Sequence, residues 1–392
     1  MWHIVKLILV FIFLFSFLGI RHFPEEIFVP VVFLLSITHY ARQCPFNKVI
    51  FGVLLCLVFN IISSYYFRNQ SFTDTLLASK DIICLMLVWY FLSWKFSLEK
   101  WEKILFWLCF VFCLCYIVQY IVWPLQIFSG QLRAGDERRF TLIGQGLASF
   151  SVIFGLNKYF CKRETKYIAL FIMGIFCVLG CGYRTILIGN FIACFCVAFR
   201  QGISLKILIK ASLVLILCVC VLDQIDYVHK TFMDMAARNE ALEGESMQDN
   251  SRFLLPGLFY TYHFKSPYEI FFGSGLCRLG IGEYGKYIGE LQEYNRMYYA
   301  DVGLLGYSWM VGIPMVLIFI CYSLWILLKK LPKEYCYINF FFLEVLVTGL
   351  TTHEFYFYSS FVLHAILFCI LTILLNQNKV CLLYTSDAAD DS

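Results

Sequence analysis

The sequence predicts an all-α polytopic membrane protein, and three observations lead to this fold class. Hydrophobic residues make up 60% of the 392 positions and charged residues only 15%, and the mean hydropathy is +0.74. A soluble domain of this length needs a more polar surface than such a composition provides. The apolar residues also fall in blocks of roughly 15 to 25, the length that a helix needs to cross a bilayer. Only one long stretch, residues 223–301, is polar and charged.

The apolar blocks predict about twelve transmembrane helices in one membrane domain, residues 1–380. The expected spans are 4–20, 27–40, 49–66, 75–94, 104–123, 141–160, 167–182, 185–199, 205–222, 302–328, 335–350 and 355–375. The first resembles a signal peptide, but "GIRHFPEE" follows it without a small-x-small cleavage site, so we interpret it as a membrane helix. The second is short and contains Pro30, which leaves a re-entrant segment as an alternative.

The distribution of basic residues predicts the orientation of these helices. With a cytoplasmic N-terminus, the inner segments hold 17 of the 31 lysines and arginines, the short outer loops hold 7, and the long loop holds the other 7. Because basic loops stay in the cytoplasm, both termini are expected inside and the large loop, between the ninth and tenth helices, outside. The inner set is mostly lysine and the short outer set mostly arginine, so the outer arginines need a reason other than topology.

Composition also bears on cofactors and partners. The net charge of +4 is small and does not favour nucleic acid as a partner. Most of the 18 cysteines lie inside apolar blocks, as in "CFVFCLC" (109–115), where cysteine acts as a small hydrophobic residue. Neither a disulfide framework nor a metal site is expected, because no CxxC occurs with matching His or Cys.

Arginine suits an anionic ligand, because its planar guanidinium binds phosphate through paired hydrogen bonds and keeps its charge. The arginines expected beside outer helix ends or in the large loop are Arg133, Arg138, Arg139, Arg184, Arg252, Arg278 and Arg296. Asp136 and Glu137 offer the first three a local neutralisation. Arg184 has no such neighbour in "GCGYRTIL", a short turn between two spans, where a charge is costly unless it lines a polar cavity.

Several polar residues could serve as a base or an orienting group. Asp301 opens the tenth span, and His353 and Glu354 form the last outer turn, "TTHEFY". A helix N-cap is the alternative role for Asp301, and a solvated turn is the alternative for His353. His263 lies in "NSRFLLPGLFYTYHF" (250–264), which reads as an amphipathic segment at the membrane interface. The glycines of "GSGLCRLGIG" (273–282) predict a tight loop rather than a nucleotide site, because no strand precedes them.

These features together resemble the superfamily of Wzy-type O-antigen polymerases and O-antigen ligases. The resemblance rests on "NSR" at 250–252, "SP" at 266–267, "GSG" at 273–275, Asp301 eleven residues before Gly312, and the twelve-helix plan with one large outer loop. Arg184 matches the family's arginine in an outer turn, and Arg252 matches the arginine that begins the amphipathic segment. Ligases typically carry His-Asn where this chain has Asp301, which is frequent in polymerases.

The resemblance implies a glycosyltransferase of the bacterial cytoplasmic membrane that needs no metal or other cofactor. It would polymerise undecaprenyl-diphosphate-linked oligosaccharide repeats into O-antigen, capsule or exopolysaccharide. Arg184, Arg252, Arg278, Arg133, Arg138 and Arg139 would bind the diphosphate, and Arg184, Asp301 and His353 would be catalytic, with the choice of base between Asp301 and His353 left open. The expected partners are these lipid-linked sugars, the bilayer and a chain-length regulator protein. An O-antigen ligase and a flippase for the same lipids are the alternatives.

The C-terminal stretch "CLLYTSDAADD" (381–391) differs from everything before it. It resembles the translation of an adapter used in transposase-based sequencing libraries. We therefore interpret residues 381–392 as a sequencing-adapter artefact and assign them no function.

Overall fold

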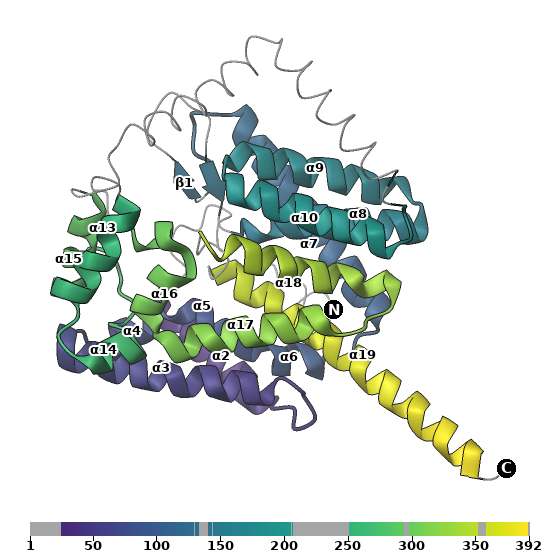
Figure 1. Cartoon of the computed structure of the whole chain (residues 1–392), viewed down its shortest axis with the longest axis horizontal. Coiled ribbons are helices and arrows are strands. Elements are labelled where there is room, and N and C mark those ends of the chain that lie inside the picture. The colour runs from purple at the N-terminus through teal and green to yellow at the C-terminus, as the bar shows by residue number, and fades with distance from the viewer. Residues whose placement is uncertain are drawn as a thin grey trace.

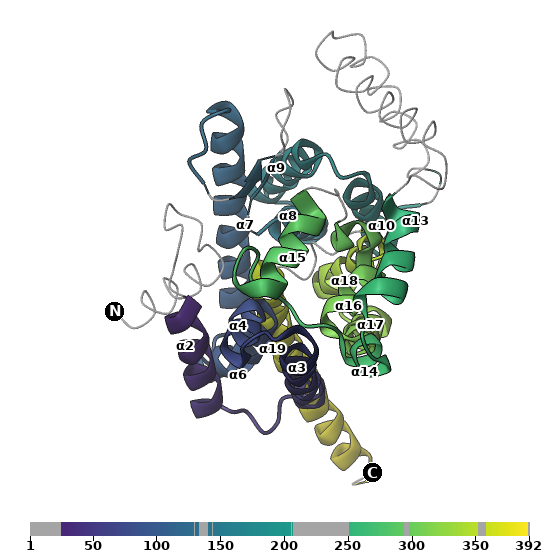
Figure 2. The same cartoon turned by 90° about the vertical axis from the view of Figure 1, so that its left-hand side faces the viewer.

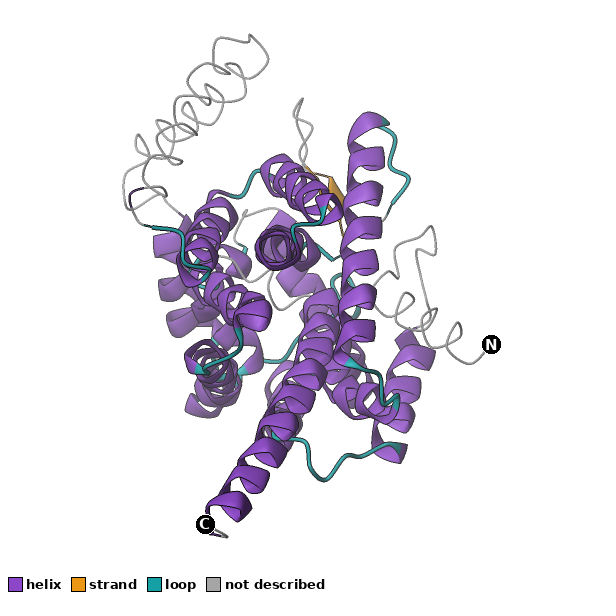
Figure 3. Ribbon diagram, turned by 90° about the vertical axis from the view of Figure 1, so that its right-hand side faces the viewer, coloured by secondary structure: helices purple, strands orange, loops and turns teal. Residues whose placement is uncertain are grey.

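The computed structural model describes residues 25–128, 130–132, 140–142, 144–204, 206, 251–293, 298–351 and 358–390. The chain is 79% helical with almost no strands, which confirms the all-α prediction (Figure 3). In chain order the elements are α2 (Glu25–Thr38), α3 (Asn47–Arg68), α4 (Phe72–Ala78), α5 (Lys80–Ile83), η1 (Cys84–Met86), α6 (Leu87–Ser93), α7 (Leu98–Ile121), β1 (Gly130–Leu132), β2 (Phe140–Leu142), α8 (Gly146–Lys162), α9 (Thr165–Cys181), α10 (Arg184–Arg200), α13 (Ser251–Leu258), η2 (Phe259–His263), α14 (Pro267–Phe272), α15 (Gly282–Glu293), η3 (Tyr299–Val302), α16 (Gly303–Val311), α17 (Ile313–Leu328), η4 (Lys333–Tyr335), α18 (Cys336–Thr348) and α19 (Tyr358–Asp390).

Helices occur at each expected span that the structure describes, although three spans differ from the prediction. The expected spans 4–20 and 205–222 lie outside the described residues, apart from residue 206. Within the described residues, three helices are long and apolar enough to cross a membrane, at 47–68, 98–121 and 360–377, and a bent pair at 72–93 makes up to four. Large apolar side chains are exposed along several of the bundle's helices, including Phe51, Leu55, Val58, Ile172, Leu179, Ile188, Phe191, Leu317 and Leu328. Such exposed apolar surface is typical of a protein that sits in a bilayer.

The expected span 75–94 is broken into α4, α5, η1 and α6. The two halves, 72–78 and 80–93, meet at an angle of 64° around Ser79. The Ser79 hydroxyl donates to the carbonyl of Thr75 at 2.7 Å. A serine that bonds the carbonyl four residues earlier competes with the helical ladder and bends the helix.

The expected span 302–328 is also broken, at Gly312. This residue has φ 95°, and a side chain there would place Cβ 2.6 Å from the backbone of Phe272. Gly273 has φ 81° and approaches the backbone of Gly312 equally closely. Asn60 of α3 closes this junction, because its amide donates to the carbonyls of Phe272 and Met310, each at 2.7 Å. Glycine is needed at both positions because a Cβ would be strained and would clash.

The expected span 141–160 begins later than predicted, because residues 140–142 form a strand. β1 and β2 pair antiparallel with Gly130 opposite Leu142, and Phe140 stacks on Tyr116 of α7 at 4.5 Å. The Tyr116 hydroxyl donates to the carbonyl of Phe140 at 3.1 Å. Strand pairing and this aromatic anchor therefore take the first residues away from α8, which starts at Gly146.

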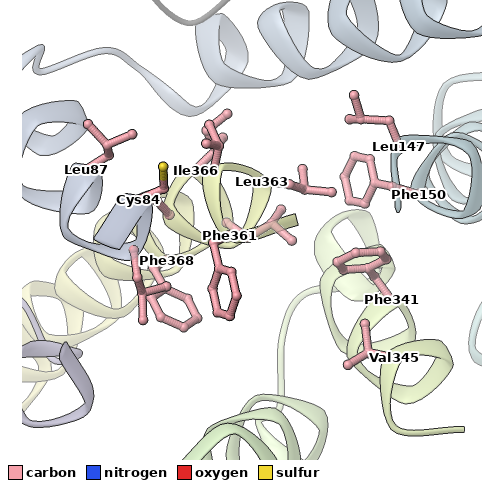
Figure 4. Packing of buried hydrophobic residues seen from close by; sticks show 14 of the residues in the cluster. Cys84, Leu87, Leu147, Phe150, Phe341, Val345, Phe361, Leu363, Ile366 and Phe368 are labelled. Atoms are coloured by element: carbon pink, nitrogen blue, oxygen red, sulfur yellow. The ribbon is translucent and has the colours of Figure 1, made fainter. Parts of the chain in front are cut away.

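The core is built around α19, whose residues from Phe361 to Leu371 are almost entirely buried. Figure 4 shows Phe368 beside Cys84 and Leu87 on one side of the helix, and Leu363 reaching toward Phe150 and Phe341 on the other. The central helix thus joins the α5–η1–α6 layer to the layer of α8 and α18 (Figure 1). Helix α19 extends through Asp390, so residues 381–390, interpreted above as an artefact, continue it.

The bundle has two chemically different ends. At the "lysine end", the start of α7, the end of α8 and η4 meet at Lys158, which is fully buried and ion-pairs with Glu102 and, at 3.2 Å, with Glu334. Lys162 also contacts Glu102 at 3.2 Å. At the opposite "loop end", α13, α14 and α15 cover the bundle (Figure 2). The candidate site lies at the loop end.

Candidate functional site

Arg184 begins α10, one of two neighbouring helices that are joined by a very short turn. Helix α9 ends at Cys181, and Gly182 caps it in the left-handed region at φ 68°. Only Gly182 and Tyr183 separate the two helices, which confirms the predicted tight turn. The Arg184 side chain is exposed, and its neighbour Thr185 accepts a hydrogen bond from the Thr351 hydroxyl at 2.6 Å. The start of α10 is therefore attached to the turn that follows α18.

The segment that contains Asp301 leads into a helix that contacts the same turn. It lies in η3 and is not the N-cap of the following helix, because α16 begins at Gly303 after Val302 and no side-chain cap bond is present there. The N-cap interpretation was therefore wrong. Gly303, at φ 59°, packs so closely on Gly349 that a Cβ would lie 2.5 Å from the Gly349 carbonyl oxygen. The Leu304 amide donates to this same carbonyl at 2.8 Å.

Residues 349–351 therefore contact both the start of α10, through Thr185, and the start of α16, two residues after Asp301. The two candidates are more than a hundred residues apart in sequence, and the sequence alone did not predict that the helix starts beside them would contact the same turn. His353 follows this turn by two residues and lies outside the described residues. The candidate site is the junction of α10, η3–α16 and the end of α18, and Arg184 and Asp301 lie in two of the segments that meet there.

Among the other predicted arginines, the structure describes the side-chain position of Arg278 but not those of Arg252, Arg133, Arg138 and Arg139. Arg278 lies 3.8 Å from Asp74 of α4, measured between Nη1 and Oδ1, so α4 sets its position. Arg252 lies in α13, but its side chain is outside the described residues. Arg133, Arg138 and Arg139 belong to the segment between β1 and β2, which is likewise outside them. The structure therefore brings the start of α10 and the start of α16 to one turn, and the roles of Arg184, Asp301 and the other arginines remain predictions.

Glu344 of α18 is a buried carboxylate that the sequence reasoning missed. It is 4% exposed and lies one turn before Thr348, on the helix that leads into residues 349–351. Its Oε1 accepts a hydrogen bond from the Asn190 amide of α10 at 3.4 Å. A lone carboxylate in the apolar run "NFFFLEVLVT" could have signalled it, because an ionisable residue inside an apolar span is usually functional.

A second missed cluster anchors the loop segment to α3. Arg68 Nε lies 2.6 Å from Oε1 of Glu269, whose side chain is fully buried, and the Arg68 guanidinium also donates to the His263 carbonyl. The second carboxylate oxygen of Glu269 accepts the Lys265 amide at 2.6 Å. Arg68 further lies over the Tyr284 ring at 5.5 Å. This cluster attaches η2, α14 and α15 to the end of α3.

His263 is buried beside this ion pair and stacks on Tyr287 with the ring centroids 5.7 Å apart. Burial, helped by the positive charge of Arg68, lowers the pKa of His263 to about 3. The imidazole is therefore neutral at physiological pH. Neither ring nitrogen has a hydrogen-bond partner among the residues that the structure describes, so this histidine is packed as an aromatic residue.

In comparisons with known proteins, no protein-family model matches this chain, and no curated protein is significantly similar to it. The function therefore has to be argued from the chemistry and placement of its own residues.

Proposed function

We propose that this protein is a membrane glycosyltransferase that polymerises undecaprenyl-diphosphate-linked oligosaccharide repeats. The observation that carries the proposal is the meeting of the Arg184 turn and the Asp301 segment at residues 349–351. In this proposal, the Arg184 guanidinium and the Asp301 carboxylate act together in a transfer in which a diphosphate leaves and a hydroxyl loses its proton. The resemblance to Wzy-type polymerases at Arg184, Asp301 and "GSG" supports the same chemistry.

In the proposed reaction, a sugar hydroxyl of one lipid-linked repeat attacks the anomeric carbon of another repeat. The bond from that carbon to the diphosphate oxygen breaks, and the electron pair stays on the diphosphate. Arg184 stabilises the charge that develops there, as positioned cations do in other transfers. Asp301 or His353 takes the hydroxyl proton. Arg252, Arg278 and the cluster of Arg133, Arg138 and Arg139 complete the diphosphate-binding set in this proposal.

The proposal includes a topology of twelve spans with both termini in the cytoplasm and the loop end outside the bacterial cytoplasmic membrane. The clustering of lysines at the opposite end of the bundle supports that orientation, because basic residues stay on the cytoplasmic side. The growing glycan and a chain-length regulator would then be met at the outer face. No nucleic acid is proposed as a partner.

The first test compares surface glycan in the source strain with that of a strain deleted for this gene, by gel laddering. Loss of the ladder with retention of single-repeat glycan is expected. Unattached long chains would instead indicate the ligase, and repeats trapped on the cytoplasmic side would indicate the flippase. Ligase is the second candidate, and Asp301 in place of the ligases' histidine counts against it.

The second test uses the two arginines at opposite ends of α10. Arg184→Ala should lower the rate of polymerisation by about 100- to 1000-fold, the usual effect of losing one group that stabilises transition-state charge. Arg184→Lys should recover only part of this rate, because lysine lacks the bidentate fork. Arg200→Ala is the matched control and should retain the ladder. Normal expression of Arg184→Ala with a full ladder would show that Arg184 does not stabilise the diphosphate.

A further inference from the structure

The amide of Asn190 links the first turn of α10 to two other helices. Its Nδ2 donates to the Ile186 carbonyl at 2.9 Å, to the Ser149 hydroxyl of α8 at 2.9 Å, and toward Glu344 of α18 at 3.4 Å. Asn190, Ser149 and Glu344 are each about 95% buried or more. Because Ile186 lies only two residues after Arg184, this amide holds the turn from which Arg184 projects.

Glu344 is the acidic member of this cluster, and its burial costs more free energy than the burial of Asn190 or Ser149. A buried carboxyl group requires hydrogen-bond donors, and here they come from Asn190 and the Ser149 hydroxyl. Gly189 allows α18 to come this close, because a Cβ there would lie 3.0 Å from Cγ2 of Thr348 and 3.3 Å from Cγ of Glu344. The carboxyl group is therefore built into the interface between α10 and α18, and it does not project from the end of the bundle.

We infer that Glu344 is a positioning residue for Arg184, acting through the side chain of Asn190. It keeps the Asn190 amide directed at the first turn of α10, so the turn and the guanidinium hold one orientation toward residues 349–351. Both hydrogen bonds use Glu344 as an acceptor, so an uncharged glutamine fulfils the same role. The link from Arg184 to catalysis rests on the proposed function, whereas the link from Glu344 to α10 does not.

The experiment measures amide hydrogen exchange in the purified full-length protein, together with the glycan ladder. The variants are Glu344→Ala, Glu344→Gln and Asn190→Ala, with Ser323→Ala of α17 as a buried polar control. In Glu344→Ala and Asn190→Ala, exchange of the amides at 188–190 should rise about tenfold, as expected for one lost buried hydrogen bond. Exchange in α3 and α19 should stay unchanged, and Glu344→Gln should match the wild type.

The exchange result decides the inference whether or not the protein is a polymerase. Faster exchange confined to the start of α10 and rescued by Glu344→Gln supports it. Unchanged exchange there, or a uniform rise across α3 and α19, overturns it, because Glu344 would then be irrelevant or merely a general stabiliser. If the ladder is lost in Arg184→Ala but complete in Glu344→Ala, positioning by Glu344 is refuted while the proposed function stands. If Arg184→Ala leaves the ladder intact, the proposed function fails, and the exchange data alone judge the link from Glu344 to α10.

Discussion

Replacing Arg68 with alanine should release the loop segment from the end of α3. The side chains of Arg68 and Glu269 are 7% and 0% exposed, and the Nε–Oε1 distance is 2.6 Å. Without the guanidinium, Glu269 keeps the Lys265 amide as a donor, but among the described residues no counter-ion is left for its buried charge. Removing one partner of a buried ion pair typically costs about 3–5 kcal/mol. Opening of the segment should therefore become more than about a hundredfold more favourable.

Limited trypsin digestion of the purified protein measures this opening directly. The part of the loop that this cluster attaches, residues 259–293, contains three trypsin sites, at Lys265, Arg278 and Lys286. When opening is fast relative to cleavage, the cleavage rate follows the population of the open form. Cleavage at these sites should therefore accelerate by more than about a hundredfold in Arg68→Ala. The apparent unfolding temperature in detergent provides a second measurement.

Two further variants separate a buried ion pair from a general loss of charge. The double variant Arg68→Met/Glu269→Gln should be much less sensitive to trypsin than Arg68→Ala, because no charge is left buried. Lys103→Ala removes an exposed pair with Glu99, in which both side chains are 71% exposed, and should not change the digestion. Wild-type digestion of Arg68→Ala would refute the role assigned to this ion pair.

Three other predictions concern stability. The pKa of His263 is about 3 in the folded chain and 6.5 in the unfolded chain, so between these values the unfolded state binds a proton that the folded state does not. The free energy of unfolding of the wild type should therefore fall by up to about 1.4 kcal/mol per pH unit below pH 6.5. Melting of the wild type and of His263→Phe across this pH range measures the difference. Gly273→Ala should lower the apparent melting temperature, because the φ of 81° at Gly273 and its close approach to the backbone of Gly312 exclude a Cβ. Gly257→Ala should keep or raise the melting temperature, because nothing lies within 4 Å of a Cβ there. Equal effects of the two changes would contradict this reasoning. Lys158→Met should lower the melting temperature by several degrees, because the charge of Glu102 stays buried after its main partner is removed. The double variant Lys158→Met/Glu102→Gln should recover most of the lost melting temperature. No recovery would show that the packing of Lys158, and not its charge, sets the stability of this end of the bundle.

Several features of this protein follow from sequence alone, because they depend on local chemistry. The apolar blocks predict helices that are apolar on all sides, as expected for helices that lie in a protein core or in a membrane. The glycines at 182 and 273 predict tight turns, because only glycine adopts these backbone angles without strain, and the structure has both. Arg184 was recognised as unusual from the sequence because a charge in a short turn between two spans is costly unless it lines a polar cavity. The function and the complete site remain predictions.

The tertiary structure decided where the apolar runs break and which distant residues become partners, because local sequence patterns do not contain this information. The breaks at Ser79 and Gly312 interrupt otherwise continuous apolar runs, and the Gly312 break depends on Phe272 and Asn60, which are distant in sequence. Arg68 pairs with Glu269 across 201 residues, and Asn190 with Glu344 across 154. Periodicity describes which face of a helix is apolar, but the choice of partner is made by packing all the helices at once. The meeting of the starts of α10 and α16 at residues 349–351 belongs to that second class, because three separate helix ends must pack together to create it.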